Sequence, residues 1–168
     1  MRNGEIDVIL RMLDQAFERR SWHGTNLRGA TRGLSAADAA WRPGPRRHNV
    51  WEIVVHAAYW KYTVRRRLLA ERRGSFPLKG SNWFPRPAAG GGTEAGWKED
   101  VALLVSTHRS LRDAVASLDA RALYRPAAGG RTPVVDLLTG IAAHDLYHAG
   151  QIQLLKRLRP SGRRTRRS

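Results

Sequence analysis

Residues 132–158 have the sequence TPVVDLLTGIAAHDLYHAGQIQLLKRL. Thr132 before Pro133 is typical of a helix start, with threonine as the N-cap and proline at the first helical position. An inward-facing row then follows at spacings of 4-3-4-3-4, made of Leu137, Ile141, His144, His148, Gln151 and Leu155. This spacing predicts one long helix that ends near Leu158, before Pro160, and carries two histidines in its apolar stripe.

Three other segments have helical spacing, and they extend from about Glu5 to Arg20, from Val50 to about Arg73 and from Trp97 to Leu118. Asn49 with Glu52 forms a capping-box pattern before the second of them. The connections are rich in glycine and proline, with one short helical piece expected at residues 35–40. We therefore predict an all-α protein, a four-helix bundle with long interhelical loops, whose long second connection crosses the bundle.

The chain has 168 residues, 42% of them hydrophobic, which fits one domain. We assign residues 1–160 to the bundle and residues 161–168 to a basic tail that we expect to be disordered. The absence of cysteine excludes disulfides and cysteine-based metal or nucleophile sites. No apolar run reaches the ~20 residues of a membrane span, and no signal peptide precedes the first helix, so we expect a cytoplasmic protein without membrane contact.

Lys and Arg outnumber Asp and Glu by 30 to 14, which gives a net charge of +16. Seven of these basic residues lie between Lys156 and Ser168, where no acidic residue occurs. Such a tail attracts nucleic acid or another polyanion without reading its sequence. The excess of arginine fits a GC-rich genome as easily as it fits nucleic-acid binding, and the tail then is only a solvated chain end. We regard this explanation without a function as the simpler one.

His144 and His148 are four residues apart on one face of the predicted helix, so both rings can reach one ion. His56 lies on the inward row of the second helix, between Ile53 and Trp60, and supplies a third imidazole. Burying several neutral imidazoles costs free energy unless they are paired, and a metal removes that cost. Three imidazoles with a vacant fourth position are typical of catalytic zinc sites. The alternative is that a carbonyl or an acid satisfies each histidine separately.

Further candidates lie near these rings. His108 occupies a core position of the third helix, Gln151 follows His148 by one turn, and His23 follows the first helix; each is either a pocket residue or an ordinary structural one. His48 is expected to be structural. Asp145 points about 100° away from His144, which favours a solvated position or an inter-helix salt bridge. Four aromatic residues are either pocket walls or plain core: Tyr59, Trp60, Tyr62 and Tyr147.

The segments HNVWEIVVHAAYWKY at residues 48–62 and HDLYHAGQI at residues 144–152 resemble the DinB/YfiT-like superfamily of metalloenzymes. The resemblance extends over nearly the whole chain. It implies a four-helix bundle, often a homodimer, in which His56, His144 and His148 bind a divalent metal ion, usually zinc or nickel. Some members resemble thiol S-transferases or isomerases that use bacillithiol, mycothiol or glutathione, and many have no assigned reaction.

Two functions follow as hypotheses. The first is a divalent-metal-dependent enzyme with a small-molecule substrate, either a low-molecular-weight-thiol S-transferase or a hydrolase that uses metal-bound hydroxide. The second is a non-catalytic, metal-stabilised binding protein whose basic surface and tail contact nucleic acid or another polyanion. The first is the better supported, because the resemblance rests on the histidines.

Overall fold

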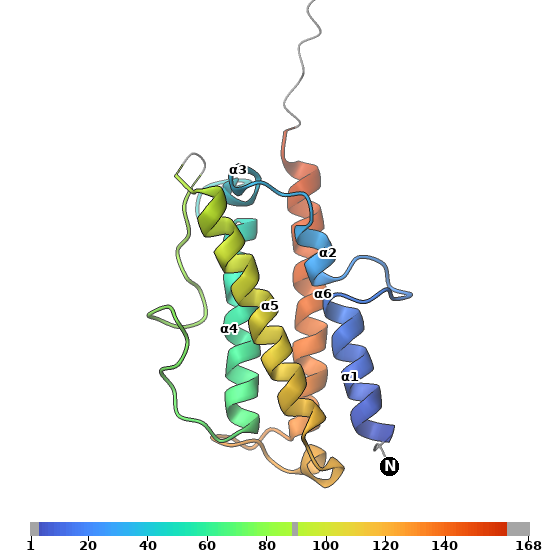
Figure 1. The fold of residues 1–168 in the computed structure, drawn as a ribbon. Coiled ribbons are helices and arrows are strands. Elements are labelled where there is room, and N and C mark those ends of the chain that lie inside the picture. The colour runs from blue at the N-terminus through green and yellow to red at the C-terminus, as the bar shows by residue number, and fades with distance from the viewer. Residues whose placement is uncertain (1–3, 89–90, 161–168) are drawn as a thin grey trace, which may run out of the picture.

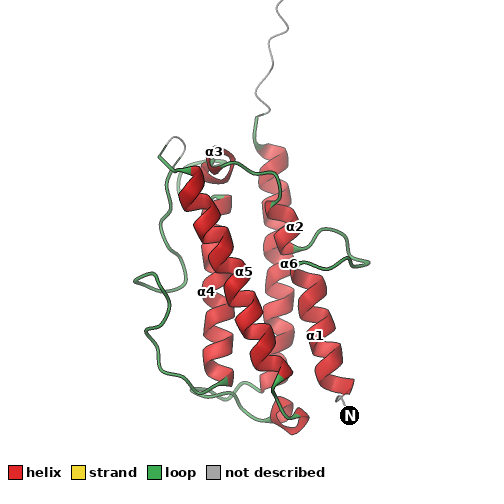
Figure 2. Ribbon diagram, viewed as in Figure 1, coloured by secondary structure: helices red, strands yellow, loops and turns green. Residues whose placement is uncertain are grey.

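A computed structural model describes residues 4–88 and 91–160 of the chain, and all its regular elements are helices (Figures 1 and 2). They are α1 (Gly4–Phe17), α2 (Leu27–Thr31), α3 (Ala36–Ala40), α4 (Val50–Leu68), α5 (Glu94–Ala116), the 3-10 helix η1 (Ala120–Tyr124) and α6 (Val134–Leu158). Over these described ranges no strand is present, which confirms the all-α class. The predicted basic tail, residues 161–168, lies outside the described residues.

The four long helices α1, α4, α5 and α6 lie side by side in Figure 1. Helix α4 packs on α5 and α6, and α1 packs on the same two helices, so the four form a closed ring of neighbours. Helices α4 and α5 both run downward in Figure 1, whereas α1 and α6 run upward. The connection after α4 therefore returns along the outside of the bundle, as its length predicts.

Local signals place the start of α4 and the end of α6 correctly, whereas α5 extends over Glu94–Ala116 rather than from Trp97 to Leu118. The Asn49 side chain accepts a hydrogen bond from the Glu52 N–H at 2.8 Å and caps α4, and the short helix expected at residues 35–40 is α3. Helix α4 ends earlier than predicted, because Ala70 has a left-handed φ of 53° and turns the chain away. Helix α1 likewise ends at Phe17 rather than near Arg20.

The predicted cap of α6 is wrong by one residue. Pro133, not Thr132, occupies the N-cap position, with φ −56° and ψ 149°, and it makes no side-chain cap. The Val134 N–H instead donates to the carbonyl of Arg125 at 3.0 Å. A loop carbonyl thus replaces the threonine hydroxyl at the start of the helix. The short helices α2 and η1 were not predicted.

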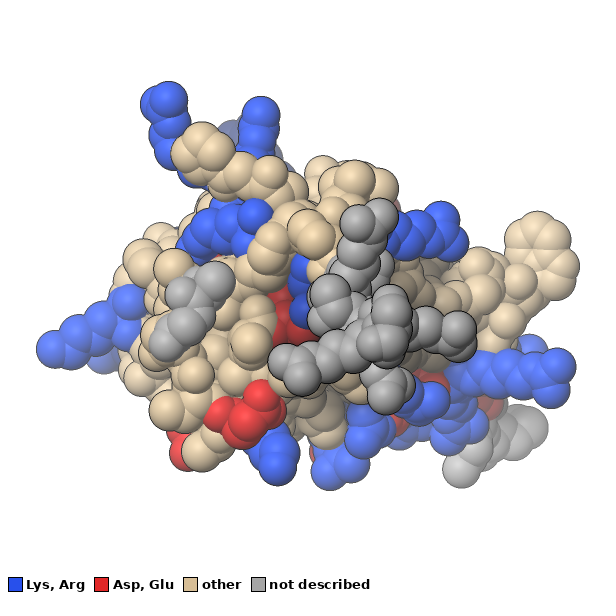
Figure 3. Space-filling view, turned by 90° about the horizontal axis from the view of Figure 1, so that it is seen from above, with Lys and Arg blue, Asp and Glu red and all other residues tan. Residues whose placement is uncertain are grey.

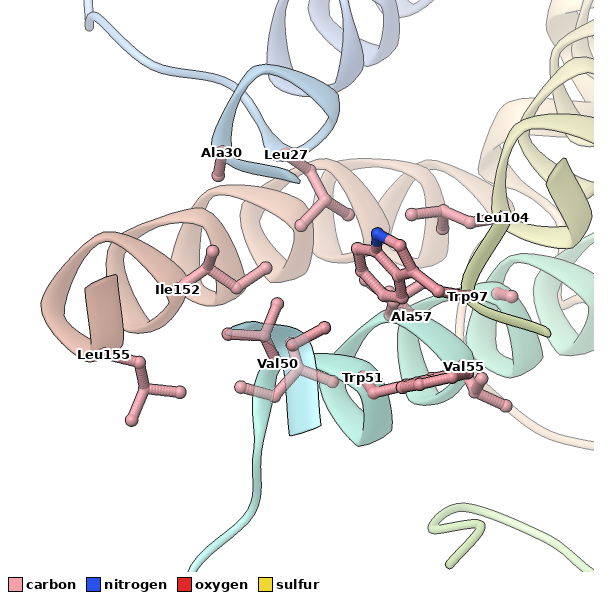
Figure 4. Packing of buried hydrophobic residues seen from close by; sticks show 14 of the residues in the cluster. Leu27, Ala30, Val50, Trp51, Val55, Ala57, Trp97, Leu104, Ile152 and Leu155 are labelled. Carbon is pink, nitrogen blue, oxygen red and sulfur yellow. The ribbon is translucent and has the colours of Figure 1, made fainter. Parts of the chain in front are cut away.

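The core consists of two hydrophobic clusters stacked along the bundle. Figure 4 shows part of the first, in which Trp51 of α4 meets Trp97 of α5 edge to face with ring centroids 5.5 Å apart, and Leu27 and Ile152 pack near them. The second cluster joins α1 to the first half of α6 and the last half of α5. Three polar residues lie between the two clusters along their helices, and each is at most 1% exposed: Lys61 of α4, His108 of α5 and Asp145 of α6. A buried polar layer therefore crosses the middle of the bundle.

The surface reflects the charge balance of the sequence. Seen from the end where α6 finishes, Lys and Arg side chains project on several sides and acidic ones are fewer (Figure 3). No helix in the described part of the chain has an apolar run that is long enough to cross a bilayer.

Candidate metal centre

His56, His144 and His148 point their Nε2 atoms at one another from α4 and α6. The His144 Nε2 atom is 3.1 Å from that of His56 and 3.0 Å from that of His148. Two of the residues are buried, whereas His144 is half-buried, so the cluster lies at the edge of the core. The predicted trio is thus brought together by two helices.

The spacing of these atoms suits a small cation. Zinc–nitrogen bonds of 2.0–2.1 Å in a tetrahedral site place neighbouring ligand nitrogens ~3.3 Å apart. The two measured separations, 3.0 and 3.1 Å, are within a few tenths of an ångström of that spacing. The three histidines could therefore hold a divalent ion after a slight outward movement of the rings.

The opposite ring nitrogens fix the orientation of two of the rings. The His56 Nδ1 donates to the Asn82 carbonyl at 2.8 Å, and the His148 Nδ1 donates to Gln151 Oε1 at 2.7 Å. These acceptors select the tautomer whose Nε2 carries a free lone pair. Gln151 is therefore brought to the cluster as the partner of His148. The Nδ1 atom of His144 is buried and has no partner in the described residues.

The electrostatic surroundings keep the rings neutral. Burial lowers the pKa of His56, and it lowers the pKa of His144 to about 3, with smaller contributions from the neighbouring histidines and Lys61. Burial also lowers the pKa of His148 to about 4. With a proton on its Nε2, His144 donates to one of its two neighbours; with the proton on its Nδ1, three Nε2 lone pairs converge and repel one another unless a cation lies between them. The donor set therefore fits a divalent metal, and zinc, nickel, iron and copper all accept three imidazoles.

The centre offers three possible protein ligands in the described residues, since no further His, Asp or Glu there brings a ligand atom to the cluster. A tetrahedral ion would keep a fourth position for a small molecule or water. The half-buried His144 marks the solvent side of the cluster.

One wall of the centre comes from the connection between α4 and α5, which sequence reasoning missed. The Trp83 ring stacks on His56 with centroids 3.9 Å apart, and His48 stacks on the other face of Trp83 at 3.6 Å. Asn82 has a left-handed φ of 63°, which turns its carbonyl toward His56. This segment has no periodic pattern, so neither residue could be identified without the fold.

His48 keeps the structural role expected of it. Its Nδ1 lies 3.0 Å from a carboxylate oxygen of Glu52, which is also paired with Arg42. Burial raises the pKa of the Glu52 carboxyl, but hydrogen bonds from Arg42 and His48 outweigh it, and the pKa falls to about 2. The ionised Glu52 holds His48, and His48 supports Trp83.

The residues of α6 that point into the core differ in part from the predicted inward row. Asp145 is fully buried and its carboxylate lies 2.5 Å from the Lys61 Nζ, so its inter-helix salt bridge is confirmed and its solvated position is wrong. His144 and Gln151 lie on the flank of this inward face and are half-buried. Burial lowers the pKa of Lys61 and raises that of Asp145 to about 6. The pair is satisfied only in part, because Asp145 Oδ1 has no partner among the described residues.

His108 is a core residue apart from the trio. It is 1% exposed and stacks on Phe17 with centroids 3.8 Å apart, and neither ring nitrogen has a partner in the described residues. Burial, followed by the charges of Lys61 and nearby arginines, lowers its pKa to about 2. The structure therefore does not place it among the ligands.

The remaining candidates are dispersed. His23 is exposed and lines a surface hollow beside Leu146 and Gly150, on another face of α6. Trp60 lies near His56 and His144, with centroids 6.3 and 6.4 Å away, and is 36% exposed. Tyr147 packs beside His148 but is largely exposed.

Comparison with known proteins gives one family. No curated protein and no protein of solved structure matches the chain significantly. The family model of the DinB superfamily matches residues 20–152, which is most of the chain and includes all three histidines. The chain belongs to the DinB superfamily.

Proposed function

We propose that this protein is a divalent-metal-dependent enzyme that transfers a low-molecular-weight thiol to a small electrophile. The observation that carries the proposal is the convergence of three neutral Nε2 atoms, two pairs of them 3.0 and 3.1 Å apart, at a half-buried position. Zinc or nickel is the metal that the family resemblance favours.

The ligand set supports an anionic partner for the metal. Three neutral imidazoles leave the charge of a divalent ion intact, so the ion, when bound, lowers the pKa of a thiol or water at the fourth position. The chain contains no cysteine, so the thiol comes from a separate small molecule.

The protein groups around the centre hold and shield the reactants. Asn82 and Gln151 fix the rings of His56 and His148, while Trp60 and Trp83 supply apolar walls beside them. In the transfer, a carbon–sulfur bond forms as a carbon–halogen bond breaks, the halide leaves and the thiol proton passes to solvent. Hydrolysis at the same position is the alternative reaction.

The test is thiol consumption by the zinc- or nickel-loaded full chain with glutathione and an aryl halide. His148→Ala should lower the rate by about 100-fold or more, since losing only a residue that orients a ligand already costs about 10–100-fold. His23→Ala is the matched control, because His23 is an exposed histidine away from the trio, and it should retain the rate. Equal rates in all three proteins contradict the proposal. Ester hydrolysis that depends on His148, without thiol consumption, makes the protein a hydrolase.

The homodimer implied by the family resemblance stays a prediction. Sedimentation of the full chain tests it directly.

A further inference from the structure

A pocket lies between α4 and the connection that follows it, apart from the three histidines. It has a volume of about 370 Å³ and lies between the second half of α4 and residues 73–81 of the following connection. Ser81 lines it, and the next residue, Asn82, is the one that orients His56. This volume is at the lower end of the range for small-molecule sites.

Aromatic rings form one side of the pocket. Phe76 lies 5.3 Å from both Tyr59 and Tyr62, measured between ring centroids. The Tyr62 hydroxyl accepts a hydrogen bond from the Gly74 N–H at 3.3 Å, which ties the connection to α4. The rings therefore form a fixed, largely apolar surface rather than a mobile loop.

Cations form the other side. Arg66, Arg73 and Lys79 line the pocket, and none of the described lining residues is acidic. The nearest acid on the connection, Glu71, already accepts two hydrogen bonds from Arg65, at 2.7 and 2.9 Å. Arg66 donates to the Glu71 carbonyl at 3.1 Å, which fixes its guanidinium without neutralising its charge. Three cations thus share one pocket without a neutralising carboxylate.

We propose that this pocket binds a small aromatic anion, a flat ring that bears a carboxylate or a phosphate group. The aromatic side takes the ring by stacking or edge contact, and the guanidinium groups take the anionic oxygens. The pocket contains none of the three histidines, so binding requires no metal at the metal centre.

The experiment is calorimetric titration of the full chain with benzoate, phenyl phosphate and the neutral isostere benzamide. At least one of the two anions should bind about tenfold or more tightly than benzamide, because charge-assisted hydrogen bonds supply the difference. The tighter of the two identifies the anionic group.

Arg73→Gln with Lys79→Gln tests the cations, and both side chains are exposed, so the fold should persist. This double variant should weaken binding about tenfold or more. Arg121→Gln with Arg131→Gln, two exposed cations outside the pocket, makes the same change in net charge and should leave binding unchanged.

Three results would overturn the inference: no anion binds, benzamide binds as tightly as the anions, or both double variants weaken binding equally. His148→Ala separates this inference from the proposed function, because that variant should lose metal and still bind the anion.

Discussion

Replacing Lys61 with methionine removes the one partner that a fully buried carboxylate, that of Asp145, has among the described residues. Lys61 and Asp145 are both 0% exposed, and the second oxygen of Asp145 already lacks a partner in the described residues. Without the ammonium group, Asp145 must either remain charged and unpaired in the core or take up a proton. Protonating a carboxyl whose ordinary pKa is 3.8 costs about 4 kcal/mol at pH 7. Breaking buried ion pairs in other proteins costs about 3–5 kcal/mol.

The same reasoning predicts a pH dependence. The protonation cost falls by about 1.4 kcal/mol per pH unit between pH 7 and pH 6. Below its folded-state pKa of about 6, Asp145 is protonated in the wild type as well. The penalty of Lys61→Met should therefore shrink by about 1.4 kcal/mol in all between pH 7 and pH 5. Urea unfolding followed by tryptophan fluorescence at pH 5, 6 and 7 measures it. The double variant Lys61→Met with Asp145→Leu removes both charges and should recover most of the loss.

Arg65→Met is the matched control on the same helix, since its partner Glu71 lies near the surface. It should cost about 1 kcal/mol or less. A penalty for Lys61→Met below about 1 kcal/mol, or one that is equal at pH 5 and pH 7, would refute the interpretation of Asp145 as a charged group that depends on Lys61.

Two further predictions concern His108 and Gln151. The pKa of His108 is about 2 in the folded state against 6.5 for the free residue. Between these values only the unfolded chain binds the proton, so the free energy of unfolding decreases as the pH is lowered below 6.5. His108→Leu should therefore lose about 3 kcal/mol less than the wild type between pH 7 and pH 4.5 in urea unfolding, and an unchanged pH dependence would disprove the assignment. Gln151→Leu removes the acceptor of the His148 Nδ1 proton and should weaken zinc binding about 10–100-fold in a chelator competition. Gln153→Leu, a half-buried glutamine on the same helix, is its control, and equal effects of the two changes would count against the orienting role.

Local physics explains what could be predicted from the sequence. The capping of α4 depends only on Asn49 and Glu52, three residues apart, and the structure contains both hydrogen bonds of the box. The pairing of His144 with His148 depends on helix geometry alone. The third imidazole, His56, could be predicted from its place on the inward-facing row of a second helix. The cap and the His144–His148 pair involve short spacings, so a single sequence suffices to find them, whereas His56 joins the cluster across 88 positions of the chain.

Other features depend on which helices become neighbours. Lys61 is a cation in the middle of α4, and a lysine there is normally solvated; its burial follows only once α6 brings Asp145 against it. Because Asp145 pairs with Lys61 in the core, the inward face of α6 is centred near Asp145, and His144 lies at the edge of that face. Trp83 lies in an irregular connection, and its stacking on His56 requires the crossover. Spacing within one segment contains no information about such contacts.

The most direct test of the metal centre is metal analysis of the purified full chain after equilibration with zinc or nickel and removal of excess ion. The wild type and His23→Ala should retain about one ion per chain, and the combined change of His56, His144 and His148 to alanine should retain none. Chelator should also lower the melting temperature of the wild type, because an ion bound only to the folded state stabilises it. A wild type that retains no ion, or a triple variant that retains as much as the wild type, would contradict the assignment of these histidines as ligands.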